Sequence, residues 1–289
     1  AEPDLPMPGY THLQRAVPSS SGLWMAAFAE AFTDNMAFAG SVSGVVDSSP
    51  LGTAAGYGVN LPLDREGVAD ELGFARLQVN PMYAQNSRGK FEIMALQAAL
   101  HAMQELRRLA WDLSLFTTSE FGFITLPSQY ITGSSIMPNK FNPDVVELLR
   151  GRAATPEGAI TEIQSVLSLP SGYQRDLQLT KAPLIRGMES SLQALAIVPA
   201  LVQGMAFNPD RMREAISTDM FATDIALERA AAGVPFRDAY LQAKKELDRL
   251  DAPDAEASLA QRVSPGACAD LRLDLIRRRL AILSQDFDK

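Results

Sequence analysis

Residues 80–117 read NPMYAQNSRGKFEIMALQAALHAMQELRRLAWDLSLFT, and this stretch determines the fold class. Its start, Asn80-Pro81, is typical of a helix N-terminus, because Asn caps free backbone amides and Pro suits the first helical position. Apolar residues then recur at steps of three and four, as on one face of an α-helix: Phe91, Ala95, Ala98, Ala102, Leu106, Leu109, Leu113 and Phe116. The pattern predicts one helix from about Pro81 to Thr117, roughly 50 Å long at about 1.5 Å per residue.

A helix of this length needs long neighbours, and further apolar stripes supply them. They lie within residues 25–39, 145–167 and 184–202, and we expect a bend in the second at Pro156. No segment alternates apolar and polar residues between turn signals, so we expect very little sheet. Beyond about Gly204 the helical units become short. We therefore predict an all-α protein, with a bundle of long helices over residues 1–204 and a small C-terminal helical domain over residues 205–289.

The composition excludes several classes of protein. The 289 residues carry 26 basic and 34 acidic side chains, a formal net charge of −8, which argues against a nucleic-acid partner or an anionic membrane. Cys268 is the single cysteine, so no intrachain disulfide forms, and with only His12 and His101 we expect no metal site. No apolar run is long enough to cross a bilayer and the N-terminus does not resemble a signal peptide, so we expect a cytoplasmic protein.

Gly133–Asn142 reads GSSIMPNKFN, a small, polar and flexible stretch. Gly133 permits unusual backbone angles, the serines donate hydrogen bonds and Lys140 supplies a positive charge, so the stretch can fold over an anion. Asn142-Pro143-Asp144 then predicts a helix start. For a Gly-Ser-Ser sequence alone, an ordinary loop would be the plain interpretation.

Met7–Arg15 reads MPGYTHLQR and combines a turn with a hydroxyl, an imidazole, an amide and a guanidinium. These groups suit proton transfer and carboxylate binding. For an isolated histidine, tying down a loop would be the commoner role of His12.

Both stretches resemble motifs of one enzyme superfamily. Gly-Ser-Ser-x-Met-Pro-x-Lys-x-Asn resembles the signature of the fumarase/aspartase superfamily, whose members eliminate an amine or a hydroxyl to release fumarate. Met7–Arg15, continued by Ala16, resembles the Thr-His motif of argininosuccinate lyases. Further segments resembling this family follow in the family's order to about Tyr240: Ser49–Gly52, Thr118–Phe123, Asn142–Asp144, Glu147–Gly151, Leu169–Tyr173, Arg175–Gln178, Ala222–Asp224 and Gly233–Ala239.

The resemblance implies a lyase of arginine biosynthesis that splits argininosuccinate into arginine and fumarate by β-elimination, without a cofactor. It implies Ser134 as the base, activated when the loop closes and excludes water. It also implies that Lys140 and Asn142 bind a substrate carboxylate and position the loop. A solvated Lys and a simple helix cap are the plain interpretations of these two residues.

The resemblance assigns the remaining site residues as well. Thr11 and His12 match the family's substrate-contacting pair, and Glu147 matches the acidic partner that fixes the tautomer of the imidazole. His12 then serves either as the acid or as an organiser of the site. The positions that hold the two ends of argininosuccinate are matched by Arg88, Tyr173, Gln178 and Lys181.

In this family three subunits of a homotetramer assemble each active site, so the resemblance implies a homotetramer with shared active sites. The family also carries a substantial N-terminal region before the Thr-His motif, with a Ser-Arg-Asn segment and a further His that help to bind substrate. This sequence begins Ala-Glu-Pro instead of Met and reaches the motif almost at once. We therefore expect a processed chain or a fragment, with incomplete activity on its own.

Three positions depart from the family pattern. Phe141 stands where Lys or Arg is usual, Gly89 where Asp is common, and Leu179-Thr180 where an acidic pair precedes Lys181. These changes leave open another fumarate-releasing amine lyase of the superfamily. A non-catalytic relative is the other alternative, since the scaffold also serves as a lens crystallin, but the intact Ser134 loop and Thr-His motif argue against it.

Overall fold

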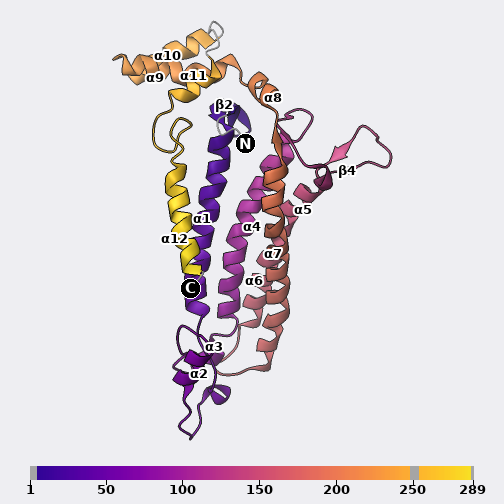
Figure 1. The fold of residues 1–289 in the computed structure, drawn as a ribbon, viewed down its shortest axis with the longest axis vertical. Helices are drawn as coiled ribbons and strands as arrows, with labels where there is room; N and C mark the ends of the chain where they lie inside the picture. The colour runs from indigo at the N-terminus through magenta and orange to yellow at the C-terminus, as the bar shows by residue number, and fades with distance from the viewer. Residues whose placement is uncertain (1–4, 248–253, 288–289) are drawn as a thin grey trace. The chain divides into compact units, whose positions relative to one another are not determined.

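The computed structural model describes residues 5–247 and 254–287, and long helices dominate them (Figure 1). The longest are α1 (Ser21–Val46), α4 (Lys90–Phe116), α6 (Ala154–Val166), α7 (Lys181–Gly204) and α12 (Leu273–Phe287). Shorter helices are α2 (Arg65–Glu71), α3 (Pro81–Asn86), α5 (Asp144–Arg152), α8 (Pro209–Glu214), α9 (Ala222–Ala231), α10 (Phe236–Glu246) and α11 (Ala255–Ala260). The predicted all-α class is confirmed. None of the described helices is long and apolar enough to cross a membrane.

Sheet within the described residues is limited to two-stranded antiparallel pairs, in line with the predicted low sheet content. A hairpin of β1 (Pro6–Thr11) and β2 (Gln14–Ser20) precedes α1. Two shorter pairs join β3 (Ile124–Thr125) to β6 (Ala206–Phe207) and β4 (Thr132–Gly133) to β5 (Phe141–Asn142). Short 3₁₀ helices complete the elements: η1 (Ala54–Gly56), η2 (Ser128–Tyr130), η3 (Arg175–Thr180) and η4 (Thr218–Phe221). The sequence patterns did not predict the first hairpin.

The chain forms two compact units. Unit 1 comprises Ala1–Glu30, Asp112–Pro143 and Gly204–Arg279, and unit 2 comprises Ala31–Trp111, Asp144–Gln203 and Leu280–Lys289. The junction at Gly204 coincides with the predicted boundary. Whether residues 205–289 fold as a separate domain stays a prediction.

The helix predicted from Pro81 to Thr117 is interrupted, so that prediction is wrong in one respect. The chain breaks between α3 and α4, where Gly89 has a φ of +82°. A Cβ atom on Gly89 would lie 2.2 Å from Cδ2 of Leu167, so a side chain here would strain the backbone and displace the Leu167 side chain. The Asp that is common here in the family would have to adopt a positive φ and displace the Leu167 side chain in this chain.

The apolar stripe of α4 is confirmed in the second half of the helix. Leu106, Leu109, Leu113 and Phe116 are buried, whereas Phe91 and the predicted alanines are only half-buried. In unit 2, Leu96 of α4 packs with Ala159, Ile160 and Ile163 of α6, and Leu184 and Met188 of α7 cover them. This cluster is the core that holds three long helices together.

The bend predicted at Pro156 lies earlier in the chain. Helix α5 ends at Arg152 and α6 begins at Ala154, so the break falls at Ala153. Pro156 belongs to the first turn of α6, where backbone amides have no partner within the helix and a missing N–H costs little.

Aromatic side chains form the core of unit 1. The Trp24 ring packs edge-on against Phe28, Phe116 and Phe207, and its Nε1 donates a hydrogen bond to Asp112 at 2.8 Å. Tyr10 of β1 packs edge-on against Phe121 with ring centroids 5.6 Å apart. The hairpin is therefore anchored to the core through Tyr10 of β1, and its turn residues His12 and Leu13 are exposed to solvent.

Candidate active site

The Thr-His motif forms the turn of the β1–β2 hairpin. Thr11 pairs with Gln14, so His12 and Leu13 alone make the turn, and their φ angles are +54° and +59°. Positive φ at both residues is the pattern of a type I′ turn, which normally selects Asn and Gly. Left-handed geometry costs a non-glycine residue about 1–2 kcal/mol. The hairpin therefore displays the exposed His12 on a strained turn, as is common at functional sites.

The serine motif forms a second hairpin, in which β4 and β5 flank a loop at Ser134–Lys140. The hydroxyl oxygen of Ser134 accepts hydrogen bonds from the backbone amides of Ile136, at 3.3 Å, and Met137, at 3.0 Å. Donors aimed at an oxygen favour its anionic form. The loop thus already supplies donors to the atom that would act as the base.

Other residues of this hairpin differ in how they are held. Asn142 pairs with Thr132 in the short sheet and α5 begins at Asp144, so the helix predicted to start at Asn142-Pro143 starts slightly later. Lys140 is exposed, and its amide closes a turn onto the Met137 carbonyl at 3.0 Å. Phe141 is 71% exposed and lines a small cavity with apolar neighbours such as Ile131, which suits an aromatic ring better than the basic residue usual in the family.

Glu147 lies in the first turn of α5, where the helix dipole favours a carboxylate. Its Oε1 is 3.8 Å from Nη2 of Arg150, one turn along the same helix. The Arg150 guanidinium in turn lies over the ring of Trp111, with Cζ 4.3 Å from the ring centroid. Glu147 is half-exposed and can reach a further partner, while the Arg150 guanidinium contacts both Glu147 and Trp111.

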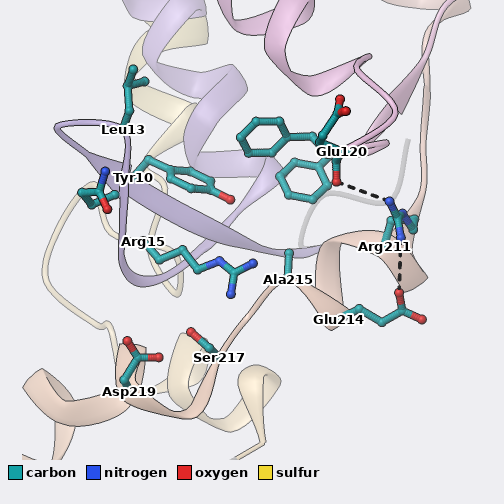
Figure 2. A pocket seen from close by; sticks show the side chains of 12 residues that line it. Tyr10, Leu13, Arg15, Glu120, Arg211, Glu214, Ala215, Ser217 and Asp219 are labelled. Carbon is teal, nitrogen blue, oxygen red and sulfur yellow. Dashed lines mark hydrogen bonds and ion pairs between the residues drawn. The ribbon is translucent and has the colours of Figure 1, made fainter.

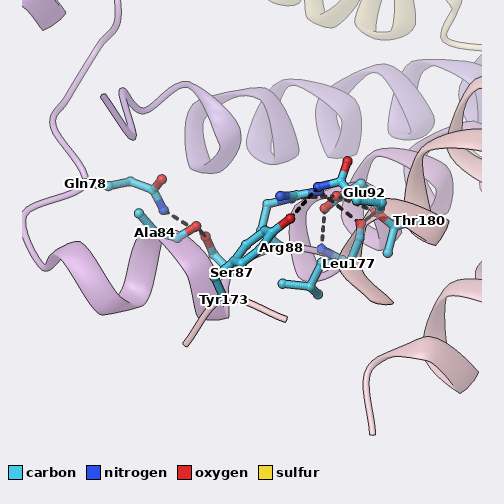
Figure 3. Close-up of polar contacts among 10 residues, drawn as sticks. Gln78, Ala84, Ser87, Arg88, Glu92, Tyr173, Leu177 and Thr180 are labelled. Carbon is cyan, nitrogen blue, oxygen red and sulfur yellow. Dashed lines mark hydrogen bonds and ion pairs between the residues drawn. The ribbon is translucent and has the colours of Figure 1, made fainter. Parts of the chain in front are cut away.

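Arg88 lies between α3 and α4, within a cluster of polar contacts (Figure 3). Its Nη2 donates to the Leu177 carbonyl at 3.0 Å, and its Nε is 3.7 Å from Oε1 of Glu92. Ser87, next to it, is buried and accepts a hydrogen bond from Gln78 Nε2 at 3.0 Å. The hydrogen bond to Ser87 therefore fixes the backbone next to Arg88, and Leu177 and Glu92 fix the Arg88 guanidinium.

Tyr173 and Gln178 belong to the same cluster. Gln178 Nε2 donates to the phenol oxygen of Tyr173 at 3.2 Å. This hydrogen bond, followed by one from Arg175 and by the charges of Arg175 and Arg88, lowers the pKa of Tyr173 below its ordinary 10.0. Tyr173 is 41% exposed, so the phenol remains open to a ligand.

The predicted residues fall into separate groups. The structure brings together Arg88, Tyr173 and Gln178 in unit 2, and Lys181 follows as the exposed first residue of α7. In unit 1 it brings together the members of each hairpin. Among the described residues of unit 1, no hydrogen bond, ion pair or ring contact joins His12 to Ser134.

Unit 1 also contains a cavity of about 760 Å³ beside the first hairpin (Figure 2). Arg15 and Arg211 line it together with Glu120, Glu214 and Asp219. The Arg211 guanidinium is already engaged in hydrogen bonds, since its Nη2 donates to the carbonyls of Ser119 and Glu120 at 3.1 and 3.3 Å. The Ser-Glu-Phe segment is thus tied to α8 by a basic side chain that the sequence did not single out.

Two other residues beside the predicted site were missed. Glu92 contacts Arg88, and Arg150 contacts Glu147. Both partners are one helical turn away, so the spacing of opposite charges could have indicated each pair. Nothing local indicates that Trp111 or Thr180 completes these contacts.

The arrangement of long helices is that of solved lyases. The crystal structure of EDDS lyase in complex with formate matches with a TM-score of 0.78 at 22% identity, covering 99% of this chain and 64% of that one. A class II fumarase from Schistosoma mansoni matches with a TM-score of 0.68 at 18% identity, covering 86% of this chain and 61% of that one. At these identities the likeness establishes the fold alone.

The chain belongs to the lyase family, whose model matches residues 1–155. It is 59% identical over 280 residues to the argininosuccinate lyase of Xanthomonas campestris pv. campestris (strain B100), covering 96% of this chain and 65% of that protein. To the argininosuccinate lyase of Stenotrophomonas maltophilia (strain K279a) it is 58% identical over 285 residues, covering 98% and 66%. The chain thus spans a little less than two thirds of the length of these relatives, and the predicted resemblance is confirmed.

Proposed function

We propose that the protein is a carbon–nitrogen lyase that splits argininosuccinate into arginine and fumarate. The observation that carries this proposal is the 59% identity to a protein named argininosuccinate lyase over 96% of the chain. The positions of Ser134, His12 and Arg88 support it, because each presents a group that a β-elimination requires. We propose further that the protein acts in the cytoplasm, in arginine biosynthesis.

Ser134 is the proposed base. Its oxygen takes the proton from the carbon beside a substrate carboxylate, and the bond from the neighbouring carbon to the guanidinium nitrogen then breaks. The electron pair of the C–H bond becomes the double bond of fumarate. The amides of Ile136 and Met137 already point at the serine oxygen and, with the charge of Lys140 in the same loop, favour its anion.

The intermediate carries extra negative charge on the carboxylate next to the deprotonated carbon. Lys140 and Asn142 are the proposed donors to that carboxylate, and Thr11 is a further contact. Arg88, Tyr173, Gln178 and Lys181 are proposed to hold the ends of the substrate, with Arg88 binding a carboxylate through the fork of its guanidinium.

His12 and Glu147 are proposed to act across subunits. The carboxylate of Glu147 would fix the tautomer of a His12 imidazole and stabilise its charged form, which favours delivery of a proton to the leaving nitrogen. This arrangement requires the proposed homotetramer with shared active sites. The exposed position of His12 on its turn and the half-exposed carboxylate of Glu147 suit partners from other subunits.

One observation favours a second candidate, a lyase of the same superfamily that acts on another succinyl-amine. Phe141 puts an exposed aromatic ring beside Lys140, and Leu179 is 62% exposed where the family has an acidic residue. If the shared active site receives these residues from different subunits, it carries less charge of both signs and would suit a less charged amine than arginine.

The experiment is a substrate comparison with the protein expressed from its whole gene. Fumarate release is followed by ultraviolet absorbance with argininosuccinate, adenylosuccinate, aspartate and malate at equal concentration. We expect kcat/KM to be at least about a hundredfold higher for argininosuccinate, because a site built for hydrogen-bonding groups rejects analogues that lack them. Preference for another succinyl-amine would overturn the assignment of argininosuccinate as the substrate. If none of the four compounds yields fumarate, the proposed lyase activity is wrong.

A further inference from the structure

The carboxylate of Glu92 is the centre of the polar cluster around Arg88 (Figure 3). Its Oε2 accepts a hydrogen bond from the backbone amide of Gly89 at 2.6 Å. Its Oε1 lies 3.1 Å from the hydroxyl of Thr180 and 3.7 Å from Nε of Arg88. One carboxylate therefore contacts Arg88 and Gly89 in the break before α4, and Thr180 at the end of η3.

The Glu92 carboxylate and the Thr180 hydroxyl are largely or fully buried, so both need polar partners. The Glu92 side chain is 14% exposed and Thr180 is fully buried. The single hydroxyl proton of Thr180 is shared between Glu92 and the Leu177 carbonyl, which lies 3.0 Å away. That carbonyl also accepts the Nη2 donor of Arg88. A carboxylate taken out of water at such a position needs partners, and here it has a cation, an amide and a hydroxyl.

The contacts leave the guanidinium of Arg88 with a defined free side. Glu92 faces its Nε and Leu177 faces one terminal nitrogen, so the plane of the guanidinium is set by contacts within the protein. Arg88 also lines a cavity of about 340 Å³ together with Asn86 and Lys90. A fork that is already oriented loses less rotamer entropy when it binds a carboxylate.

We propose that Glu92 is a positioning residue, which orients the Arg88 guanidinium for a substrate carboxylate and ties it to the segment that carries Gln178. The proposal deepens the proposed function and rests on it in one respect, since Arg88 is taken to bind substrate. Thr180 stands where the family has an acidic residue. An Asp there would put a second negative charge against Glu92, so in this chain Glu92 supplies the carboxylate and Thr180 a hydroxyl to bind it.

A purely structural role for Glu92 predicts different behaviour from a positioning role. A structural residue weakens ligand binding through the whole fold, whether or not Arg88 is present. A positioning residue acts through Arg88, so its effect disappears once the Arg88 side chain has been removed. A double-mutant cycle between the two residues distinguishes these cases.

The cycle measures the Kd for argininosuccinate by calorimetry, in a Ser134→Ala background that prevents turnover. Glu92→Gln keeps the shape of the side chain and removes its charge. We expect it to weaken binding about tenfold, and to weaken it less than about twofold when Arg88→Ala is already present. Thr180→Val, which removes only a hydroxyl, should weaken binding to a smaller extent. Glu162→Gln, at an exposed ion pair with Arg186 in the same unit, is the matched control and should leave Kd unchanged.

Equal losses with and without Arg88 would overturn the positioning role, as would unchanged binding in Glu92→Gln. A second measurement needs no ligand: solvent exchange of the Arg88 Nε proton by nuclear magnetic resonance, expected to become about tenfold faster in Glu92→Gln. If the parent protein does not bind argininosuccinate, the proposed function fails and this exchange rate alone decides the role of Glu92. An unchanged rate would then overturn it.

Discussion

The guanidinium of Arg150 lies over the indole of Trp111, with Cζ 4.3 Å from the ring centroid, and its Nη2 is 3.8 Å from Oε1 of Glu147. Trp111 is 52% exposed, so its ring packs against Arg150 at the surface and does not fill a core. A cation held by a ring and a carboxylate keeps both partners in one arrangement. Glu147, the proposed partner of His12, is therefore held in place by an aromatic residue from α4.

Removing the ring tests this relationship. In Trp111→Leu, Arg150 loses an interaction of about 0.5–1 kcal/mol, and we expect kcat/KM for argininosuccinate to fall about two- to fivefold. Trp111→Phe, which keeps an aromatic face, should lose less. Steady-state kinetics of the two variants provide the comparison. Equal rates for both variants and the wild-type protein would show that the ring does not support Glu147.

The turn at His12-Leu13 predicts an unusual gain from glycine. Leu13→Gly relieves a positive φ that costs about 1–2 kcal/mol but adds about 0.5–1 kcal/mol of unfolded-state entropy, so the free energy of unfolding should rise by about 0.5–1 kcal/mol. Leu13→Val should lower it, because a branched side chain tolerates this conformation less. Urea unfolding measures the free energy of unfolding of both variants, provided that the dependence on urea concentration keeps the same slope.

Leu61→Gly is the matched control for the turn, because Leu61 is 65% exposed and its φ is not positive. It should leave stability unchanged or lower it. If Leu13→Gly lowers stability as much as Leu61→Gly does, the turn is not strained and the argument from its geometry fails.

The pKa of Tyr173 provides a prediction in pH. It is lowered chiefly because Gln178 donates a hydrogen bond to the phenol oxygen, which stabilises the deprotonated form. In Gln178→Leu this donor is gone, so the phenolate of Tyr173 should form at higher pH than in the wild-type protein. Absorbance of the phenolate, taken as a difference from Tyr173→Phe, gives the midpoint. A midpoint that stays or moves to lower pH would contradict the assigned cause.

The parts of the fold that could be predicted depend on local sequence. The stripe that ends at Leu113 and Phe116 is one helix face, and its large residues from Leu106 onward are buried as expected. The break at Gly89 could not be found in the same way, because it depends on Leu167 from a distant segment. Asn80-Pro81 is a true helix start, yet the helix that it starts ends at Asn86.

The site shows the same division. The serine loop was found because its composition and its motif agree, and the structure adds that the loop is a hairpin whose amides point at Ser134. The hairpin at His12-Leu13 was missed, because neither residue is typical of a two-residue turn. Glu92 was missed as well, since its role depends on Thr180, which reaches it only through the folded chain.

Fumarate release from argininosuccinate by the wild-type protein and by Ser134→Ala, measured side by side with the protein expressed from its whole gene, tests the central claim most directly. We expect turnover by the wild-type protein and a loss of about 10²–10⁴-fold in Ser134→Ala, the effect of removing an acid–base group. Circular dichroism and unfolding of the two proteins should coincide, since Ser134 lies in a loop whose other residues, 135–140, are exposed. A folded Ser134→Ala variant with wild-type turnover would contradict the assignment of Ser134 as the base.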